Sequence, residues 1–167
     1  MKLYNKKSYI DYLIYSAVIV GGIFLDQLTK WLSVKFLMPL GKSVPIIDGV
    51  LQLTYVENTG AAFGMLKEHR WVFILVSTVA ILGISLFLYL GHAPTRFTAI
   101  SLSMIISGGI GNMIDRLFLG YVVDFIDFCL IDFAVFNGAD SFVCVGCALM
   151  VLAILIMPST EKQEDKK

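Results

Sequence analysis

Residues 71–90 read WVFILVSTVAILGISLFLYL, a run that contains no charged side chain. A helix that crosses the hydrocarbon core of a membrane needs about 20 mostly apolar residues, and this run meets that length. The whole composition agrees, because 57% of the residues are hydrophobic, only 16% are charged and the mean hydropathy is +0.81. Soluble domains are about half apolar and a quarter charged. The sequence therefore predicts a protein whose solvent is lipid.

Three further runs are long and apolar enough to cross a membrane: residues 10–32, 97–114 and 141–157. The first of them differs from the others because it carries Asp26 and Lys30 in its second half. The last of them ends at Pro158, which cannot continue a helix. The sequence therefore predicts four transmembrane helices, packed as an all-α membrane bundle within a single domain over residues 1–158.

The connections between these runs predict a small sheet and an interfacial segment. Residues 51–56 follow a period of two, and turn signals flank them, so we expect an extracytoplasmic antiparallel β-sheet within residues 40–67. Residues 117–139 alternate aromatic with acidic side chains, and we expect this second outer connection to lie in the membrane interface. Residues 159–167 form a charged tail, which we expect in the cytoplasm.

Charge near the ends of the runs predicts the orientation in the membrane. Lys2, Lys6 and Lys7 precede the first run, and Lys and Arg near span ends favour the cytoplasmic side. With four spans, both termini lie on that side, together with the turn that contains Arg96. The first run lacks a small-residue cleavage site, so we interpret it as an uncleaved span rather than a signal peptide.

The formal net charge is zero, which excludes two classes of protein. A disordered chain would combine low hydrophobicity with high net charge, and a nucleic-acid-binding protein would carry a clustered basic excess. The three cysteines favour neither a metal nor a redox site, since Cys144 and Cys147 form a C-x-x-C without a second pair. We interpret these two as buried apolar side chains.

Acidic residues nevertheless gather in one region, because residues 115–140 carry a local charge of −4. Its acids are Asp115, Asp124, Asp127, Asp132 and Asp140. In an up-down bundle, this region meets Asp26 and Lys30 at one membrane boundary. Each residue alone has a structural interpretation: Asp26 and Lys30 form an ion pair one turn apart, and Asp140 is an N-cap candidate. The convergence of several is harder to explain by capping, and ionisable groups within spans indicate a functional site by default.

Two close carboxylates at such a boundary are suited to amide hydrolysis. They share one proton, so the ionised member can take a proton from water while the protonated member donates to a carbonyl oxygen. No competing catalytic set stands out, because His69 and His92 fall at opposite ends of the second span and no H-E-x-x-H motif occurs. Residue chemistry alone does not choose the pair among the five acids.

Five motifs then carry a resemblance to a known family. They are Asp26–Lys30 (DQLTK), Glu57–Gly64 (ENTGAAFG), Gly108–Arg116 (GGIGNMIDR), Val122–Phe125 (VVDF) and Phe136–Ser141 (FNGADS). In order and spacing, and over nearly the whole chain, they resemble the motifs of the lipoprotein signal peptidases (signal peptidase II). These are bacterial membrane aspartic peptidases that cleave prolipoprotein signal peptides before a diacylglyceryl-modified cysteine.

The resemblance implies roles for individual residues. Asp124 and Asp140 would be the catalytic pair. The residues that would bind or orient the substrate or the pair are Asn112, Arg116, Asn137, Asn58, Gly60, Asp26, Lys30 and Asp115. The family uses no metal and no cofactor, its partners are prolipoproteins, membrane lipid and inhibitors of the globomycin type, and it resides in the cytoplasmic (inner) membrane with the site at the outer leaflet boundary.

Two other functions compete with the peptidase. A small proton-coupled transporter would use the acids as a relay, but a relay needs ionisable groups at several depths, whereas the run 71–90 has none. A non-catalytic assembly factor would use the outer sheet as a docking surface. Cleavage of a lipid-modified prolipoprotein would separate all three.

Overall fold

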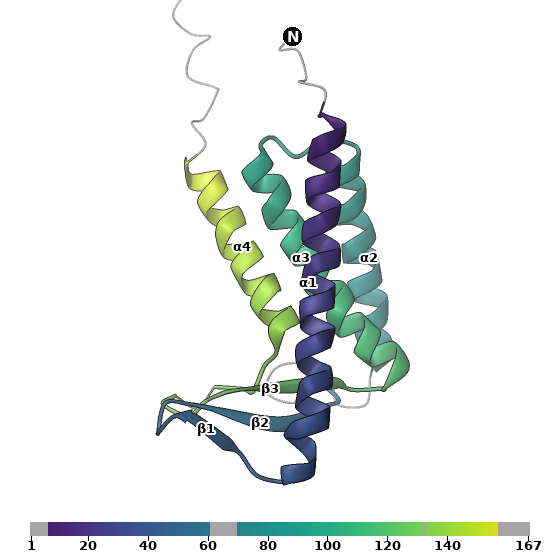
Figure 1. The fold of residues 1–167 in the computed structure, drawn as a ribbon. Helices are drawn as coiled ribbons and strands as arrows, with labels where there is room; N and C mark the ends of the chain where they lie inside the picture. The colour runs from purple at the N-terminus through teal and green to yellow at the C-terminus, as the bar shows by residue number, and fades with distance from the viewer. Residues whose placement is uncertain (1–6, 61–69, 132, 157–167) are drawn as a thin grey trace, which may run out of the picture.

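The computed structural model describes residues 7–60, 70–131 and 133–156. Four helices run side by side, and a sheet crosses one end of the bundle (Figure 1). The elements in chain order are α1 (Tyr9–Phe36), the 3₁₀ turn η1 (Met38–Leu40), β1 (Val44–Ile47), β2 (Leu51–Asn58), α2 (Arg70–Tyr89), α3 (Arg96–Phe118), β3 (Val122–Phe128) and α4 (Gly138–Ile156). The expected β-region beyond residue 60 and the C-terminal tail lie outside the described residues.

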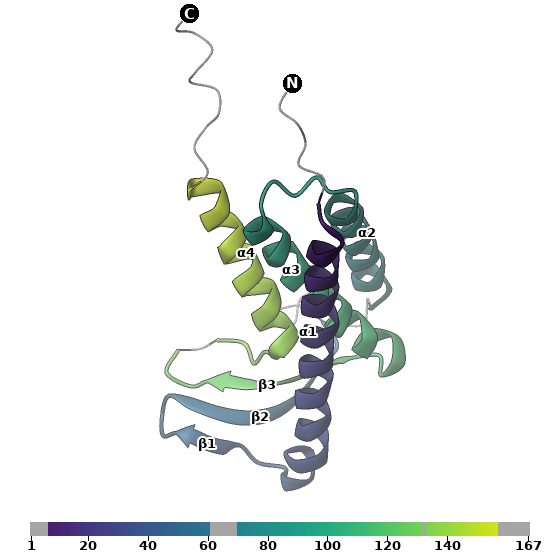
Figure 2. The ribbon, with the colours of Figure 1, turned by 45° about the horizontal axis from the view of Figure 1, so that its top comes forward.

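Polar caps begin the helices at the end away from the sheet. The Ser8 hydroxyl accepts from the Ile10 amide at 3.4 Å, and the Asp11 carboxylate accepts in return from the Ser8 amide at 2.9 Å. At the start of α3, the Thr95 hydroxyl accepts from the Thr98 amide at 3.1 Å. Such caps satisfy amide groups that the first helical turn leaves without partners. α1 begins and α4 ends at this same end of the bundle (Figure 2).

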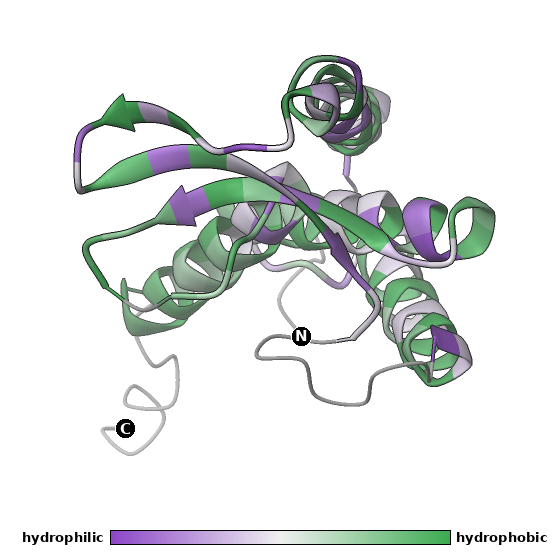
Figure 3. Cartoon of the chain, turned by 90° about the horizontal axis from the view of Figure 1, so that it is seen from below, coloured by the Kyte–Doolittle hydropathy of each residue, from purple (hydrophilic) through white to green (hydrophobic). Residues whose placement is uncertain are grey.

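All four helices are long and apolar enough to cross a membrane. Their outward side chains are apolar as well, since Leu75, Val79 and Leu86 of α2 are each more than 60% exposed. In water such a surface would be a liability, whereas lipid tails solvate it. Figure 3 shows largely hydrophobic helices, with hydrophilic segments concentrated where the strands cross beneath them. The predicted four-helix bundle with a small antiparallel sheet is confirmed.

Glycines of α3 let the neighbouring helices approach closely. A Cβ at Gly108 would overlap the carbonyl oxygen of Ala139 in α4 and lie 2.7 Å from the Val143 side chain. A Cβ at Gly111 would overlap the Asp26 carboxylate of α1. Small residues at helix interfaces are a common means of packing in membranes, where helices gain little from hydrophobic burial against each other. α3 is accordingly the most buried helix of the four.

The sheet has the order β1-β2-β3 and is antiparallel throughout. β2 pairs with β1 through Val44↔Leu53 and with β3 through Asn58↔Val122. The third strand adds to the sequence analysis, which expected the sheet within residues 40–67 and an interfacial connection over residues 117–139. β3 buries both of its faces at its start, because Val122, Val123, Asp124 and Phe125 are all buried. Such a strand lacks the alternating pattern of a half-buried one.

The helices also extend past the predicted spans at the sheet end. α1 continues to Phe36 and α3 to Phe118, so Asn112, Asp115 and Arg116 lie on the last turns of a helix. The interpretation of Cys144 and Cys147 as buried side chains is wrong, because both are exposed on α4. Apolar side chains of a membrane helix face lipid as readily as core, so their type alone does not predict burial.

We expect Gly108→Ala to lower the thermal unfolding midpoint of the detergent-solubilised protein by several degrees. Its methyl group would press on the α4 backbone, and overpacking costs about 1–3 kcal/mol, with each kcal/mol worth about 2–4 °C in a chain of this size. Gly21→Ala is the matched control, because nothing lies within 4 Å of a Cβ there. Equal midpoints for the two variants would contradict the close contact of α3 with α4.

Candidate active site

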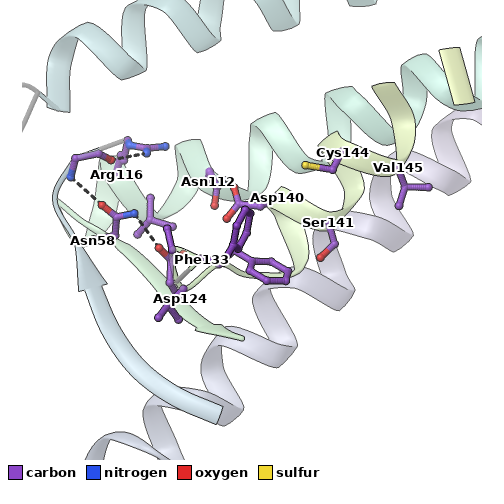
Figure 4. A pocket seen from close by; sticks show the side chains of 14 residues that line it. Asn58, Asn112, Arg116, Asp124, Phe133, Asp140, Ser141, Cys144 and Val145 are labelled. Atoms are coloured by element: carbon purple, nitrogen blue, oxygen red, sulfur yellow. Dashed lines mark hydrogen bonds between the residues drawn. The ribbon is translucent and has the colours of Figure 1, made fainter. Parts of the chain in front are cut away.

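A cavity of about 530 Å³ opens between the sheet and the adjoining ends of α3 and α4. Its lining is mostly apolar, with polar side chains converging from four segments (Figure 4). Those from the sheet are Asn58 and Asp124, and those from the helices are Asn112, Arg116 and Asp140; Gly60 follows β2. Concave apolar sites with a few convergent polar groups are typical of ligand and active sites.

Asp124 is held in the middle of this arrangement by two side-chain amides. It lies on β3 with 1% of its surface exposed. Its Oδ1 accepts from Asn137 Nδ2 at 2.6 Å, and its Oδ2 accepts from Asn58 Nδ2 at 2.8 Å. The Gly60 amide donates to Asn58 Oδ1 at 3.0 Å, which directs the Asn58 amino group to the carboxylate. Asp124 therefore has both oxygens occupied and a fixed orientation.

Burial raises the pKa of Asp124 from 3.8 to about 6. The hydrogen bonds from Asn58 and Asn137 lower it, the charge of Asp140 raises it, and the charge of Lys30 lowers it. A buried carboxyl resists ionisation because the low dielectric disfavours the charged form. Asp124 can therefore change its protonation state near neutral pH, as an acid–base catalyst must.

Asp140 lies in the first turn of α4, where it forms a capping box with Asn137. The Asn137 amide donates to Asp140 Oδ2 at 3.2 Å, and the Asp140 amide donates to Asn137 Oδ1 at 3.0 Å. The alternative in which Asp140 is itself the N-cap is wrong, because Asn137 occupies that position. The other Asp140 oxygen, Oδ1, accepts from Asn112 Nδ2 at 2.7 Å.

Behind the cavity lies a buried ionic cluster that joins α1 to α3. The Lys30 ammonium is 2.9 Å from Asp26 Oδ2, 2.9 Å from Asp115 Oδ2 and 2.9 Å from Asn112 Oδ1. Gln27 donates to Asp115 Oδ1 at 3.0 Å and to Asp26 Oδ2 at 3.2 Å. The three charged residues are between 1% and 3% exposed. Buried charges need such complete pairing, because each is costly to remove from water.

Arg116 borders the cavity on the α2 side. Its guanidinium donates to the Gly60 carbonyl oxygen at 3.3 Å and lies 4.8 Å from the centre of the Phe73 ring. The ring stabilises the cation from one face, and the carbonyl holds one of its five donors. Arg116 thus lines the same cavity as the Asp124 and Asp140 carboxylates, and it has donors available for a ligand.

Ten residues were predicted for the site, and the structure divides them into two layers. Asn58, Gly60, Asn112, Arg116, Asp124 and Asp140 line the cavity. The other four, Asn137, Asp26, Lys30 and Asp115, lie behind the lining and contact its members. Of the two remaining acids, Asp127 accepts from Gln52 at 2.6 Å on the sheet, and Asp132 lies outside the described residues.

The sequence analysis missed further residues of the site. Phe133–Phe136 line the cavity, as do Ser141, Cys144 and Val145 of α4. For the α4 residues, helical spacing contained a signal. Residues four apart share a helix face, and Cys144 follows Asp140 at that interval. Gln27 lies within a quoted motif but was given no role. In the described part of the chain, no three His, Cys, Asp or Glu side chains gather as metal ligands would.

The spans and the paired carboxylates define an integral membrane protein with an acid–base site at one end of its bundle. The sequence model of signal peptidase (SPase) II matches residues 18–156. The chain belongs to the signal peptidase II family, which consists of proteases of the aspartic type. It is a multi-pass bacterial membrane protein, and the transporter alternative is not supported.

Individual relatives agree with the family assignment. The lipoprotein signal peptidase of Brevibacillus brevis is 43% identical over 87% of this chain and 95% of its own length. That of Caldanaerobacter subterraneus is 48% identical over 80% of this chain and 90% of its own length. A bacterial membrane enzyme whose structure was determined by the in meso method is similar with a TM-score of 0.80 and 30% identity, covering 92% of this chain and 94% of that one.

We expect Asn58→Ala to raise the pKa of Asp124 above about 6, because the Asn58 amide stabilises the carboxylate form. Carbon-13 NMR of the side-chain carboxyls, assigned with Asp124→Asn, would follow the titration. Gln52→Ala is the control, since it removes an amide that donates to Asp127 in the same sheet. An Asp124 titration at the same pH in Asn58→Ala and in the unmodified protein would contradict the role of this hydrogen bond.

Proposed function

We propose that this protein removes signal peptides from diacylglyceryl-modified prolipoproteins and cleaves before the lipidated cysteine, with Asp124 and Asp140 as the catalytic pair. One observation carries the assignment of the pair. Among the acids of the described chain, these two line one cavity, and each accepts hydrogen bonds on both carboxylate oxygens. The name of the relatives, lipoprotein signal peptidase, supports the substrate class.

The pair acts as an acid and a base while it holds one proton. The ionised carboxylate takes a proton from water, and the water oxygen attacks the scissile carbonyl carbon. The protonated carboxyl gives its proton to the carbonyl oxygen, which produces a neutral tetrahedral diol. A diol hydroxyl then returns a proton to one carboxylate as the other carboxyl protonates the amide nitrogen, and the carbon–nitrogen bond breaks.

The surrounding amides fix this geometry. The Asn112 side chain donates to Asp140, and the Asn137 side chain donates to Asp124. Asn58 donates to the second oxygen of Asp124, Oδ2. Positioning of this kind matters because a displacement of about 1 Å in reacting groups can cost roughly 100-fold in rate. Arg116 and Gly60 would bind the peptide backbone of the substrate, since the guanidinium retains donors beside the carboxylates.

The apolar part of the cavity suits a lipid-modified substrate. Phe133, Val145 and Cys144 line it and are exposed, so the cavity opens onto the apolar surface of α4. The acyl chains of the substrate and neighbouring membrane lipid would contact this surface. A cyclic peptide inhibitor of the globomycin type would occupy the same cavity and exclude the substrate.

The sheet and the cavity would face the outer side of the cytoplasmic (inner) membrane. The start of α1 and the end of α4 lie at the end of the bundle away from the sheet (Figure 1), and the lysines that precede α1 in the sequence favour the cytoplasm for that end. The scissile bond would then sit at the outer leaflet boundary, where a translocated prolipoprotein leaves its signal helix in the membrane.

Cleavage tests the catalytic assignment. Purified protein in detergent is given a diacylglyceryl-modified prolipoprotein, and product is measured by the mass shift. We expect Asp124→Asn and Asp140→Asn to lower turnover at least about 100-fold, since each removes a proton-transfer group. Asp127→Asn, on the same sheet but outside the cavity lining, should stay within about twofold. Absence of cleavage by the unmodified protein, or full cleavage by both variants, would overturn the proposal.

Labelling tests the orientation. In a cysteine-free background, Asp48→Cys lies in the turn between β1 and β2, and Pro94→Cys lies in the turn between α2 and α3; both positions are exposed. A membrane-impermeant maleimide added to intact cells, whose outer membrane if present is made permeable, should label the first and spare the second. The reverse pattern would invert the proposed orientation.

A further inference from the structure

Lys30 of α1 is buried against α3, yet it does not line the cavity. Its side chain is 4% exposed, and its ammonium has three partners. The carboxylates of Asp26 and Asp115 balance its charge from α1 and α3. The third partner, Asn112 Oδ1, is neutral and belongs to the cavity lining. Charge balance accounts for the first two contacts but leaves the third unexplained.

The contact with Lys30 fixes which way the Asn112 amide points. Asn112 Oδ1 faces two donors, Lys30 Nζ at 2.9 Å and Asn137 Nδ2 at 3.1 Å. An ammonium can only donate, and the Asn137 amide is itself oriented, because its oxygen accepts from the Asp140 amide. A reversed Asn112 would turn its amino group toward two donors and its oxygen toward a carboxylate. The amino group is therefore directed to Asp140 Oδ1, at 2.7 Å.

The two side chains that donate to Asp140 and Asp124, Asn112 and Asn137, contact each other at Asn112 Oδ1. Asn112 donates to Asp140, and the Asn137 amino group that contacts Asn112 donates to Asp124 at 2.6 Å. Lys30 provides the full positive charge at this junction. The chain of contacts thus runs from the ionic cluster through one amide oxygen to both acids.

We propose that Lys30 is a positioning residue for peptide hydrolysis, acting through Asn112 to hold the side chains that orient Asp140 and Asp124. This inference rests on the proposed function. The competing explanation makes Lys30 only a counter-ion that ties α1 to α3. The two explanations differ in what happens when the charge is compensated by other means.

The experiment compares the single variant Lys30→Met with the double variant Lys30→Met/Asp26→Asn. The single variant leaves two buried carboxylates without a cation, so a loss of folding in it is explained by that alone. The double variant keeps the native net charge of the cluster and retains Asp115. Lys35→Met, at an exposed lysine of the same helix, controls for the loss of a lysine. Thermal unfolding in detergent reports folding, and kcat and KM are measured on the lipid-modified prolipoprotein.

We expect the folded double variant to have a kcat at least tenfold below that of the unmodified protein, with KM within about twofold. A structural counter-ion predicts instead that kcat returns together with the unfolding midpoint, and that result would overturn the proposal. Asp124→Asn and Asp140→Asn are measured in parallel. If these variants cleave fully, the proposed function fails independently of Lys30.

A double-mutant cycle with Asn112→Ala tests whether Lys30 acts on the two carboxylates through Asn112. If Lys30 acts through Asn112, adding Lys30→Met/Asp26→Asn to Asn112→Ala should lower kcat by less than twofold further. If the two sets of substitutions instead multiply their effects on kcat, Lys30 acts by another route and the proposal is wrong.

Discussion

The Lys30 ammonium forms buried ion pairs with the carboxylates of Asp26 and Asp115. These carboxylates also accept hydrogen bonds from the backbone of two other elements. Asp26 Oδ1 accepts from the Ala139 amide at the start of α4 at 2.8 Å, and Asp115 Oδ2 accepts from the Val123 amide of β3 at 3.1 Å. One buried cluster therefore joins α1, α3, α4 and β3. Each link satisfies a charge or an amide that would otherwise be costly to bury, so the elements are constrained together.

This constraint explains why the site lies at the ends of its elements. The amide that Asp26 binds belongs to the residue before Asp140, and the amide that Asp115 binds belongs to the residue before Asp124. The close approach of α3 to α4 at Gly108 brings Asn112 to Asp140 one turn further along. The ionic cluster thus fixes the backbone beside both carboxylates, and helix packing adds the contact of Asn112 with Asp140.

The sequence predicts the membrane spans and the cluster of acids, but it does not predict the third strand or the contacts within the site. Long uncharged runs specify spans because lipid leaves a helix few alternatives. β3 was missed because Val122–Phe125 is buried on both faces and has no alternating pattern. The cluster of acids was visible, but five acids are chemically alike, and the resemblance to a family was needed to choose two. Which amide meets which carboxylate depends on contacts between residues up to 113 positions apart, which no local pattern encodes.

The acids of this bundle divide according to their partners. Asp26 and Asp115 are each 2.9 Å from the Lys30 ammonium, and these ion pairs hold them in place within the fold. Asp124 instead receives hydrogen bonds from neutral amides, and burial raises its pKa to about 6. An ammonium in direct contact would favour the ionised form of Asp124 and remove its capacity to act as an acid. Asn112 and Asn137 therefore stand between Lys30 and the two carboxylates that we propose exchange protons, and they separate these carboxylates from the charge that holds the fold together.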